Sequence, residues 1–187
     1  MKVSKWTPDE TEVVYKTPIF DLWRQRATHP RRRPKDFYIL DVPSWVNIIP
    51  LTSDGQVVMV KQFRHGIGNF TLEIPGGMVD PEDETPRHAA RREMREESGY
   101  DSKRIAALGR VHPNPAIEGN YCYSFWARDV RQVGKPHLDG SEETEVVLVP
   151  LRHIPRAIAS GKITHALVIA AFSFFHVYNP PRARTAS

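Results

Sequence analysis

Three glutamates, Glu93, Glu96 and Glu97, are the residues of this sequence whose type and spacing best suit chemistry. Successive residues of an α-helix turn by about 100°, so positions i, i+3 and i+4 lie on one face within reach of one another. Like charges at that spacing repel, so the cluster must be screened, protonated or bound to a cation. Clusters of carboxylate oxygens suit hard divalent ions, and we therefore expect Mg²⁺ or Mn²⁺ as the cofactor.

A solvated, charged helix is the competing interpretation of the same residues. Arg91, Arg92 and Arg95 lie among the acids and can pair with them without any metal ion. The residues before the helix favour a site. A strand that ends in Pro75-Gly76-Gly77 lets the backbone approach a ligand or turn a carbonyl group toward a metal.

The helix that carries the glutamates has start and stop signals of its own. Thr85 can cap exposed amide groups, and Pro86 is tolerated in the first turn. We expect the helix to run to about Ser98, with Gly99 as its stop. The glutamates are therefore expected on a helix that follows the glycine-rich loop directly.

The segment as a whole resembles the signature of the Nudix hydrolases. In that family a glycine is followed, after a spacer, by a glutamate, seven residues, and the order Arg-Glu-apolar-x-Glu-Glu-x-Gly-apolar. Here Glu84 is followed by seven residues and then by REMREESGY, from Arg92 to Tyr100. The spacer between Gly77 and Glu84 has six residues, one more than in the family. Either Glu84 or Asp83 then takes the place of the first glutamate.

The resemblance covers most of the chain, from about Tyr15 to Tyr178, and points to one branch of the family. The segments WVNIIPLTSDGQVVMVKQFRHG, TLEIPGGMVD, HPNPAIEGNYCYSFWA and EETEVVLVPL look like the branch that cleaves ADP-ribose and other nucleoside diphosphate sugars. This implies hydrolysis of the diphosphate bond to a nucleoside monophosphate and a sugar phosphate. It also implies a homodimer in which the N-terminal strands, within residues 1–42, pair or exchange between subunits.

The same resemblance implies roles for the residues of the motif. The metal ligands would be the side chains of Glu93, Glu96 and Glu97 and the carbonyl group of Gly76. Arg92 would hold the glutamates in register through charge-assisted hydrogen bonds. Ions held in this way neutralise a diphosphate, lower the pKa of a bound water and orient it for attack on phosphorus.

In this branch the base that activates water often comes from an acidic loop outside the motif. The corresponding segment here is LDGSEETE, in which Glu142 and Glu143 precede a strand that starts near Thr144. Strand alternation sends Glu143 and Glu145 to the same side, so the sequence alone does not choose among these acids. A solvated loop is the alternative.

Three further residues are candidates for binding the substrate. Arg64 in VKQFRHG carries a guanidinium fork that matches phosphate oxygens, although an ordinary surface arginine fits the sequence as well. Glu73 in LEIP either supports the site or is a charge on a strand face. Asn114 lies in the proline-stiffened loop HPNPAIEGN, which either borders the sugar pocket or is only structural. His165, at the start of the last helix, is expected only to cap or pack there.

The elements around these residues predict an α/β fold. Alternation predicts antiparallel strands in the first ~40 residues, joined by the basic loop HPRRRPK, and a hairpin around Ser53-Asp54-Gly55. Further strands are expected at FTLEIP and near residues 106–112, 121–127 and 144–150, followed by a short helix ending at Gly161 and a longer apolar one. This irregular order favours a mixed sheet covered by helices. The resemblance implies the Nudix α/β/α sandwich, as a single domain over residues 1–178, and residues 179–187 are expected to be a disordered tail.

Length and composition limit the class of protein. A chain of 187 residues suits one domain, and 40% hydrophobic with 26% charged residues is ordinary for a soluble protein. The longest apolar run, residues 166–175, is well short of the roughly 20 residues of a spanning helix. No secretory signal is visible, and the single cysteine, Cys122, fits a reducing cytosol. We therefore expect a cytoplasmic protein without a membrane partner.

Other functions leave traces that are weaker here. The net charge of +4 is modest and the basic run is short, so nucleic-acid binding is not expected, and the run is either a flexible loop or a contact for an anion. Action on another diphosphate, such as coenzyme A, NADH or a dinucleoside polyphosphate, is one alternative. A nucleotide-binding regulator that keeps the fold without catalysis is another, although the presence of all three glutamates argues against it.

Overall fold

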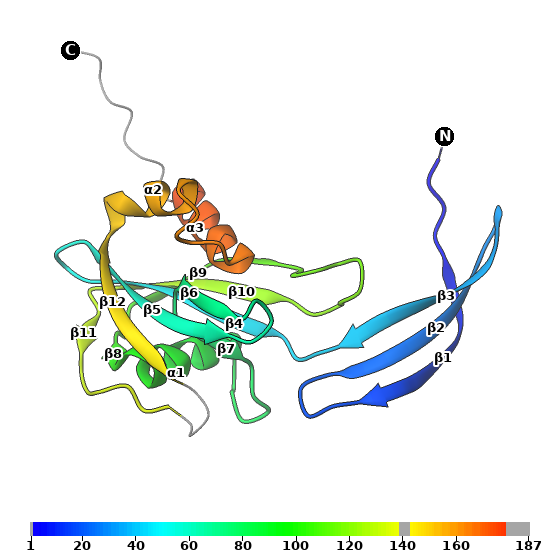
Figure 1. The fold of residues 1–187 in the computed structure, drawn as a ribbon, viewed down its shortest axis with the longest axis horizontal. Helices are drawn as coiled ribbons and strands as arrows, with labels where there is room; N and C mark the ends of the chain where they lie inside the picture. Colours follow the sequence, from blue (N-terminus) through cyan, green and yellow to red (C-terminus); the bar gives the residue numbers. More distant parts are fainter. Residues whose placement is uncertain (1, 139–142, 179–187) are drawn as a thin grey trace, which may run out of the picture. The chain divides into compact units, whose positions relative to one another are not determined.

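The computed structural model describes residues 2–138 and 143–178, and its contacts group the chain into two compact units. The first unit comprises Met1–Ser44 and His112–Tyr121, and the second comprises Trp45–Val111 and Cys122–Ser187. Figure 1 shows the course of the chain with its elements labelled. Each unit therefore has its own framework of strands.

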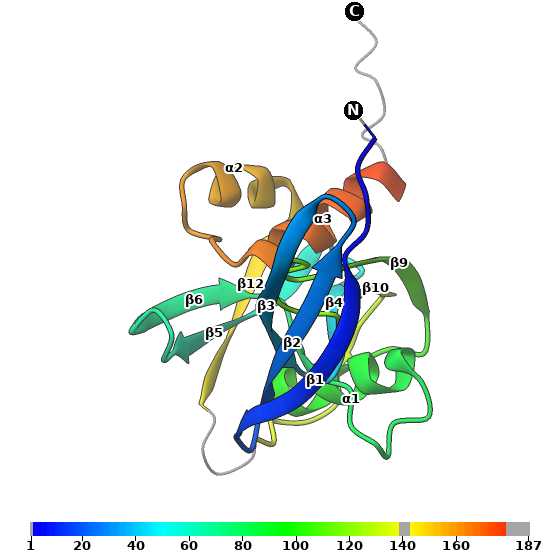
Figure 2. The same ribbon diagram turned by 90° about the vertical axis from the view of Figure 1, so that its right-hand side faces the viewer.

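The first unit is built on a three-stranded antiparallel sheet (Figure 2). It contains β1 (Thr7–Lys16), β2 (Asp21–His29) and β3 (Arg32–Asp41), with β2 in the middle. Thr17 shapes the connection between the first two strands, because its hydroxyl oxygen accepts a hydrogen bond from the N–H of Phe20 at 2.9 Å. The prediction of antiparallel N-terminal strands is confirmed.

The basic run is not the loop that was predicted. β2 ends at His29 and β3 starts at Arg32, so only Pro30 and Arg31 connect the two strands. The remaining basic residues, up to Lys35, are exposed positions of β3. A hairpin arm that faces solvent needs no apolar residues, which is why the charged run continues a strand.

The returning segment of the first unit packs against the end of β3. The N–H of Leu40 donates to the carbonyl of Ile117 at 2.8 Å. Nearby, the side-chain amide of Asn120 donates to the carbonyl of Pro43 at 2.9 Å. These bonds join a segment that is remote in sequence to the sheet of the same unit.

The second unit contains a mixed sheet and several short strands. These strands are β4 (Trp45–Leu51), β5 (Gln56–Arg64), β6 (Asn69–Glu73), β7 (Gly76–Met78), β8 (Tyr100–Asp101), β9 (Ile105–Val111), β10 (Cys122–Arg128), β11 (Arg131–Gln132) and β12 (Thr144–Pro150). The main order is β12-β5-β4-β10-β9, with β6 beside β5 and β7 beside β4, while β8 and β11 form a separate pair. Among the described strands of this sheet only the β10–β4 pairing is parallel, so the predicted mixed sheet is confirmed.

One face of this sheet is covered by α1 (Pro86–Ser98). Ile48 and Val58 of the sheet are fully buried there against Ala90 and Met94 of the helix. Small residues on the helix let it lie close to the strands. This face therefore sets the distance between the sheet and the helix that carries the glutamates.

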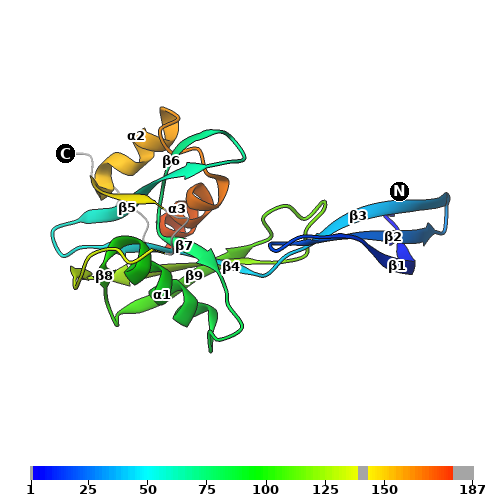
Figure 3. The same cartoon turned by 60° about the horizontal axis from the view of Figure 1, so that its bottom comes forward.

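The opposite face is covered by α3 (Ala166–Tyr178), which follows the short helix α2 (Ile154–Ala159). Ile49 and Val57, the sequence neighbours of the residues that face α1, pack here against Phe172. Figure 3 shows the two helical layers on either side of the strands. The predicted α/β/α sandwich is confirmed, because successive strand residues alternate between two apolar layers.

The second unit has a tight turn at Gly55 and a buried cysteine, Cys122. The predicted hairpin between β4 and β5 turns at Gly55, whose φ of 83° is left-handed and suits glycine. Cys122 at the start of β10 is 1% exposed, and its burial raises the pKa of the thiol to about 12. Among residues 2–138 and 143–178 we find no helix with the length and hydrophobicity needed to cross a membrane.

Candidate active site

The helix α1 begins and ends at its predicted capping residues. The hydroxyl oxygen of Thr85 accepts a hydrogen bond from the N–H of His88 at 3.2 Å, and Pro86 is in the first turn. At the other end Gly99 has a φ of 71°, and its N–H donates to the carbonyl of Arg95 at 2.9 Å. The prediction of the helix and of both its ends is confirmed.

Glu97 is a buried carboxylate on the sheet side of α1. It is 4% exposed, and its Oε2 accepts a hydrogen bond from the N–H of Gly76 at 3.0 Å. Gly76 lies opposite Asn47 in the pairing of β7 with β4, so the sheet fixes the position of this N–H group. A buried carboxylate needs hydrogen-bond donors or a cation around it. Glu97 therefore joins the glutamate cluster to the sheet.

The two glycines form a short strand, not the loop that was predicted. They belong to β7, and close packing explains why both positions lack a side chain. A Cβ atom on Gly77 would collide with the carboxylate of Glu93, and one on Gly76 would collide with the carbonyl oxygen of Val46. The glycines thus allow the backbone to lie directly against the glutamates.

Arg92 lies among four carboxylates. Its Nη1 donates to Oε1 of Glu93 at 2.9 Å and to Oε2 of Glu96 at 3.0 Å. Its Nη2 lies 2.8 Å from Oδ2 of Asp83 and 3.0 Å from Oδ2 of Asp80. The hydrogen bond with Asp83 is the main cause that raises the pKa of the guanidinium above its ordinary value. One cation faces four acids, so the cluster keeps an excess of negative charge.

Asp83, and not Glu84, meets the arginine of the motif. The side chain of Asp83 is 2% exposed and is also bound by Nδ1 of His88 at 2.9 Å and by the N–H of Asp80 at 3.1 Å. The hydrogen bond from Arg92 is the main reason why the pKa of Asp83 is lowered to about 2. Glu84 is exposed. The extra residue of the spacer therefore brings the aspartate to the arginine.

The carboxylates as they stand do not converge on a point where an ion would sit. Within residues 2–138 and 143–178, no three His, Cys, Asp or Glu side chains are arranged to hold a metal. Glu93 and Glu96 face Arg92, whereas Glu97 faces the N–H of Gly76. The donor set still fits a hard divalent ion, because every donor is a carboxylate oxygen and the acids outnumber the cation they share.

Arg64 and Glu73 form a two-pronged ion pair between β5 and β6. Nε and Nη2 of Arg64 donate to Oε1 and Oε2 of Glu73, both at 2.8 Å, and the hydroxyl of Thr71 donates to Oε1 at 2.5 Å. Burial by itself raises the pKa of Glu73, but the hydrogen bonds from Arg64 and Thr71 and the charges of Arg64 and His165 lower it overall. The two predicted substrate-binding residues are therefore partners of each other.

His165 makes a contact that the sequence did not signal. Its Nδ1 accepts a hydrogen bond from the N–H of Leu167 at 3.2 Å, so the expected capping at the start of α3 is confirmed. Its Nε2 lies 3.7 Å from Oε2 of Glu73. The two residues are far apart in the chain and meet only because α3 packs on the sheet, so no local pattern reveals the contact.

The first residue of β12 contacts the end of α1. The hydroxyl of Thr144 donates to the carbonyl of Glu97 at 3.0 Å, and Glu143, the preceding residue, is exposed. Glu145 forms an ion pair at 3.1 Å with a lysine of β5. Glu142 lies outside the described residues. Glu143 and Glu145 thus both flank a residue that contacts the glutamate helix, and they differ in that Glu145 is engaged by the lysine.

Asn114 belongs to the first unit, where it forms a turn. Its carbonyl oxygen accepts hydrogen bonds from the N–H groups of Ile117 and Glu118 at 3.0 and 2.8 Å. The glutamates, Arg64 and Glu73 all belong to the second unit. These contacts are those of a structural turn, and the place of Asn114 beside a sugar pocket stays a prediction.

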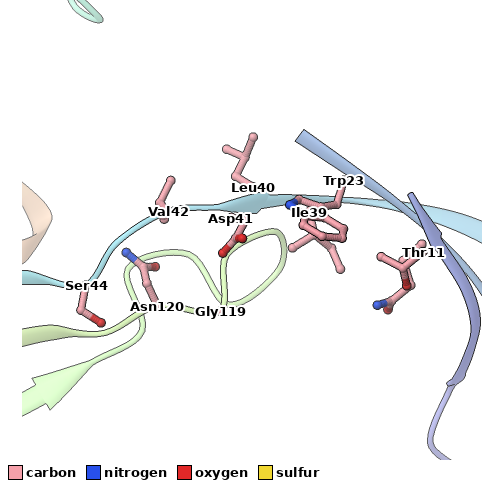
Figure 4. Close-up of a pocket in the computed structure, with 10 residues that line it drawn as sticks. Thr11, Trp23, Ile39, Leu40, Asp41, Val42, Ser44, Gly119 and Asn120 are labelled. Atoms are coloured by element: carbon pink, nitrogen blue, oxygen red, sulfur yellow. The ribbon is translucent and has the colours of Figure 1, made fainter. Parts of the chain in front are cut away.

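The first unit also has a pocket of its own, of about 360 Å³ (Figure 4). Residues that line it include Thr11, Trp23, Ile39, Asp41, Ser44 and Asn120. The indole nitrogen of Trp23 and Oδ1 of Asn120 are buried without a hydrogen-bond partner within the described part of the chain. The pocket is thus partly polar, and it contains none of the acids of the motif.

Known proteins share both the motif and the fold. The family model described as NUDIX domain matches residues 43–172. A protein named ADP-ribose pyrophosphatase from Bacillus subtilis (strain 168) is 26% identical over 167 residues, which cover 89% of this chain and 90% of the relative. A protein of the same name from Mycobacterium tuberculosis (strain ATCC 25618 / H37Rv) is 26% identical over 168 residues, with coverage of 89% and 81%.

A solved structure extends the likeness to the whole course of the backbone. The crystal structure of an ADP compounds hydrolase matches with a TM-score of 0.82 and 20% identity, over 95% of this chain and 96% of that one. The family model spans β7, α1 and the complete run from Arg92 to Tyr100. The chain therefore belongs to the Nudix family and is a Nudix pyrophosphohydrolase.

Proposed function

We propose that the protein hydrolyses the diphosphate bond of ADP-ribose or another nucleoside diphosphate sugar with the help of Mg²⁺ or Mn²⁺. The observation that carries this proposal is the buried carboxylate of Glu97, which stands with Glu93 and Glu96 on α1 against the glycine strand β7. The names of the two bacterial relatives support ADP-ribose as a substrate. The products would be a nucleoside monophosphate and a sugar phosphate.

The acids of α1 would hold the metal. Glu93, Glu96 and Glu97 supply side-chain oxygens, and Gly76 supplies a carbonyl group from the adjacent strand. A divalent ion in this place offsets the charge of a diphosphate and lowers the pKa of a bound water. Arg92 keeps Glu93 and Glu96 in position through its two hydrogen bonds at 2.9 and 3.0 Å.

The residues outside the motif would act on the water and on the diphosphate. Glu143, or Glu142 beside it, would accept a proton from the water as its oxygen bonds to phosphorus, while the bridging oxygen leaves with the other phosphate. Arg64 would bind an anionic oxygen of the diphosphate, with its guanidinium held by Glu73. Water activation and phosphate binding are thus assigned to different segments of the chain.

A substrate panel tests the proposed function. Release of phosphate, coupled to a phosphatase, would be measured for ADP-ribose, ADP-glucose, GDP-mannose, UDP-glucose, NADH and coenzyme A, with and without Mg²⁺. We expect metal-dependent turnover concentrated on one or a few nucleoside diphosphate sugars. Turnover confined to NADH or coenzyme A would show that the substrate is another diphosphate. No turnover at all would favour a protein that binds nucleotides without catalysis.

Three variants test the assigned residues on the best substrate. Glu97→Gln keeps an acceptor for Gly76 but removes the charge, so we expect kcat to fall about 1000-fold while the protein stays folded by circular dichroism. Glu143→Gln is expected to lower kcat about 100-fold. Glu145→Gln is the control, because Glu145 is engaged on the surface. A fully active Glu97→Gln protein would refute the metal site, and equal effects at positions 143 and 145 would refute the choice of base.

The N-terminal strands would form a homodimer. β1 is exposed along its whole length, and it carries the apolar side chains of Val13, Val14 and Tyr15 at 37%, 48% and 64% exposure. An edge strand with apolar side chains offers unpaired backbone groups to a partner. Light scattering of the purified protein should give twice the monomer mass of 21.4 kDa, and a monomer at micromolar concentration would refute the dimer.

A further inference from the structure

We propose that His165, which lies outside the Nudix signature, is a positioning residue of the diphosphate-binding site. It acts through Glu73, which holds the guanidinium of Arg64. The inference rests on one part of the proposed function, namely that Arg64 binds the diphosphate. All three residues belong to the second unit: Arg64 is on β5, Glu73 is on β6, and His165 directly precedes α3.

The cap of α3 fixes which nitrogen of the imidazole carries the proton. Nδ1 of His165 accepts a hydrogen bond from the N–H of Leu167 at 3.2 Å, so the proton of the neutral ring is on Nε2. Nε2 is the nitrogen that lies 3.7 Å from Oε2 of Glu73. The ring therefore turns its N–H group toward the carboxylate of Glu73.

The backbone around His165 is anchored to the sheet, so the ring has a defined place. The side-chain amide of Asn47, which is 5% exposed, donates to the carbonyl of Leu167 at 3.0 Å. Asn47 belongs to β4 and lies opposite Gly76 in the pairing with β7. The start of α3 is thus tied to the strand that also aligns the glycine next to Glu97.

Glu73 is the residue that connects the ring of His165 to Arg64. Its side chain is 5% exposed, and Oε1 receives both Nε of Arg64 and the hydroxyl of Thr71, whereas Oε2 receives Nη2 of Arg64 and faces His165. The plane of the carboxylate sets the plane of the guanidinium in such a two-pronged pair. The position of Glu73 therefore sets the plane in which Arg64 presents its guanidinium.

The pair is also close to the glutamate helix along the chain. Glu73 is followed, three residues later, by Gly76, and three residues span at most about 10 Å. The carbonyl of Pro75 accepts a hydrogen bond from the N–H of Ile48 at 2.9 Å, which holds the connection against β4. Glu73, which holds Arg64, therefore lies along the chain within about 10 Å of the glycine that contacts Glu97.

Two substitutions separate the contact with Glu73 from the helix cap. His165→Asn retains an oxygen near the place of Nδ1, and asparagine is a favoured N-cap, but its side chain is too short to reach Glu73. His165→Gln places an amide nitrogen near the position of Nε2 and gives up the cap. Both proteins would be assayed on the substrate that the wild type hydrolyses best, and their thermal unfolding would be recorded.

For the positioning role we expect the asparagine variant to raise KM about five-fold, with kcat within about two-fold and an unchanged melting temperature. The glutamine variant should restore a KM close to that of the wild type but melt a few degrees lower, because the cap is lost. In a Glu73→Gln background, His165→Asn should raise KM no further. An unchanged KM in the asparagine variant, or equal KM values in the two single variants, would show that His165 only caps the helix.

A second readout needs no turnover. The Nε proton of Arg64, identified by its absence in an Arg64→Lys protein, should exchange slowly with water in the wild type and several-fold faster in the asparagine variant. Equal exchange rates overturn the role of His165 whatever the activity. If the wild type hydrolyses none of the panel, the proposed function fails, whereas the exchange rates still decide whether His165 positions Arg64.

Discussion

Two arginines of the second unit, Arg92 and Arg64, are bound to acids in opposite proportions. Arg92 on α1 faces four carboxylates, those of Asp80, Asp83, Glu93 and Glu96. Arg64 on β5 forms a two-pronged pair with the buried carboxylate of Glu73, and Oε2 of that carboxylate lies 3.7 Å from Nε2 of His165. Among the described contacts, several carboxylates therefore share Arg92, whereas the carboxylate of Glu73 pairs with one arginine.

In the proposed function this difference would separate a place for a cation from a place for an anion. The carboxylates around Arg92 would suit a divalent ion, and Arg92 would hold Glu93 and Glu96 in position beside it. Arg64, whose plane is set by Glu73, would bind the diphosphate. The first place is on α1 and the second is on β5.

The largest effect is expected when Arg92 is removed. Arg92→Ala leaves Asp83, whose side chain is 2% exposed, without its cation, so the free energy of unfolding should fall by about 3 kcal/mol. Activity should fall about 100-fold, because Glu93 and Glu96 lose their common partner. Urea unfolding and kcat/KM measure the two effects.

The matched control lies on the same helix. Arg91 forms a two-pronged pair with Asp101 at 2.7 Å, but it has no contact with the motif glutamates among the described bonds. Arg91→Ala should cost about 1 kcal/mol and leave kcat/KM close to the wild-type value. If the two variants lost activity equally, Arg92 would have no special place among the acids.

An intermediate effect is expected from pH. The pKa of Asp83 is lowered to about 2, so the group stabilises the fold above the ordinary pKa of an aspartate, near 3.8, and this contribution is lost as pH falls toward 2. Asp83→Asn should therefore unfold about 2 kcal/mol more easily than the wild type at pH 6. The difference should shrink between pH 4 and pH 2, as followed by urea unfolding.

Glu84, the exposed neighbour, is the control for this experiment. Glu84→Gln should match the wild type at every pH, because no ion pair of Glu84 is among the described contacts. A pH-dependent loss at position 84 with none at position 83 would mean that Glu84 takes the place of the first glutamate of the motif.

The smallest effect is expected at the second arginine. Arg64→Gln should raise KM for the diphosphate substrate about ten-fold, with a smaller change in kcat, since in the proposed function Arg64 would contact the phosphate and not the metal. Glutamine keeps an amide donor for the buried carboxylate of Glu73, so the protein should remain folded with a smaller loss of stability than Arg92→Ala. A drop in kcat without a change in KM would place Arg64 with the catalytic acids and would remove the contrast with Arg92.

The features that local sequence could predict are those set by neighbours in the chain. The helix α1 follows from Thr85, Pro86 and Gly99, and the glutamate face follows from helical periodicity. The β4–β5 hairpin follows from Asp54-Gly55 in the same way. Each of these depends on a few consecutive residues, whose conformational preferences are enough to fix the local structure.

The features that were missed depend on contacts between remote residues. The pairing of Arg64 with Glu73 requires the register of β5 and β6, and the contact of His165 requires the packing of α3. The choice of Asp83 over Glu84 depends on how a six-residue spacer folds back toward Arg92. The basic run became a strand because its partner β2 continues alongside it. In each case the deciding partner is one that spacing and composition do not identify.

Because Cys122 is buried, the reactivity of its thiol reports when the sheet opens. This residue begins the parallel pairing of β10 with β4, opposite Trp45, and alkylating reagents react with the thiolate, not with the thiol. With the thiol pKa raised to about 12 and 1% exposure, modification must wait until these strands separate. The rate at which the only cysteine of the chain is labelled under native conditions therefore reports how often the centre of the sheet comes apart, without any introduced probe.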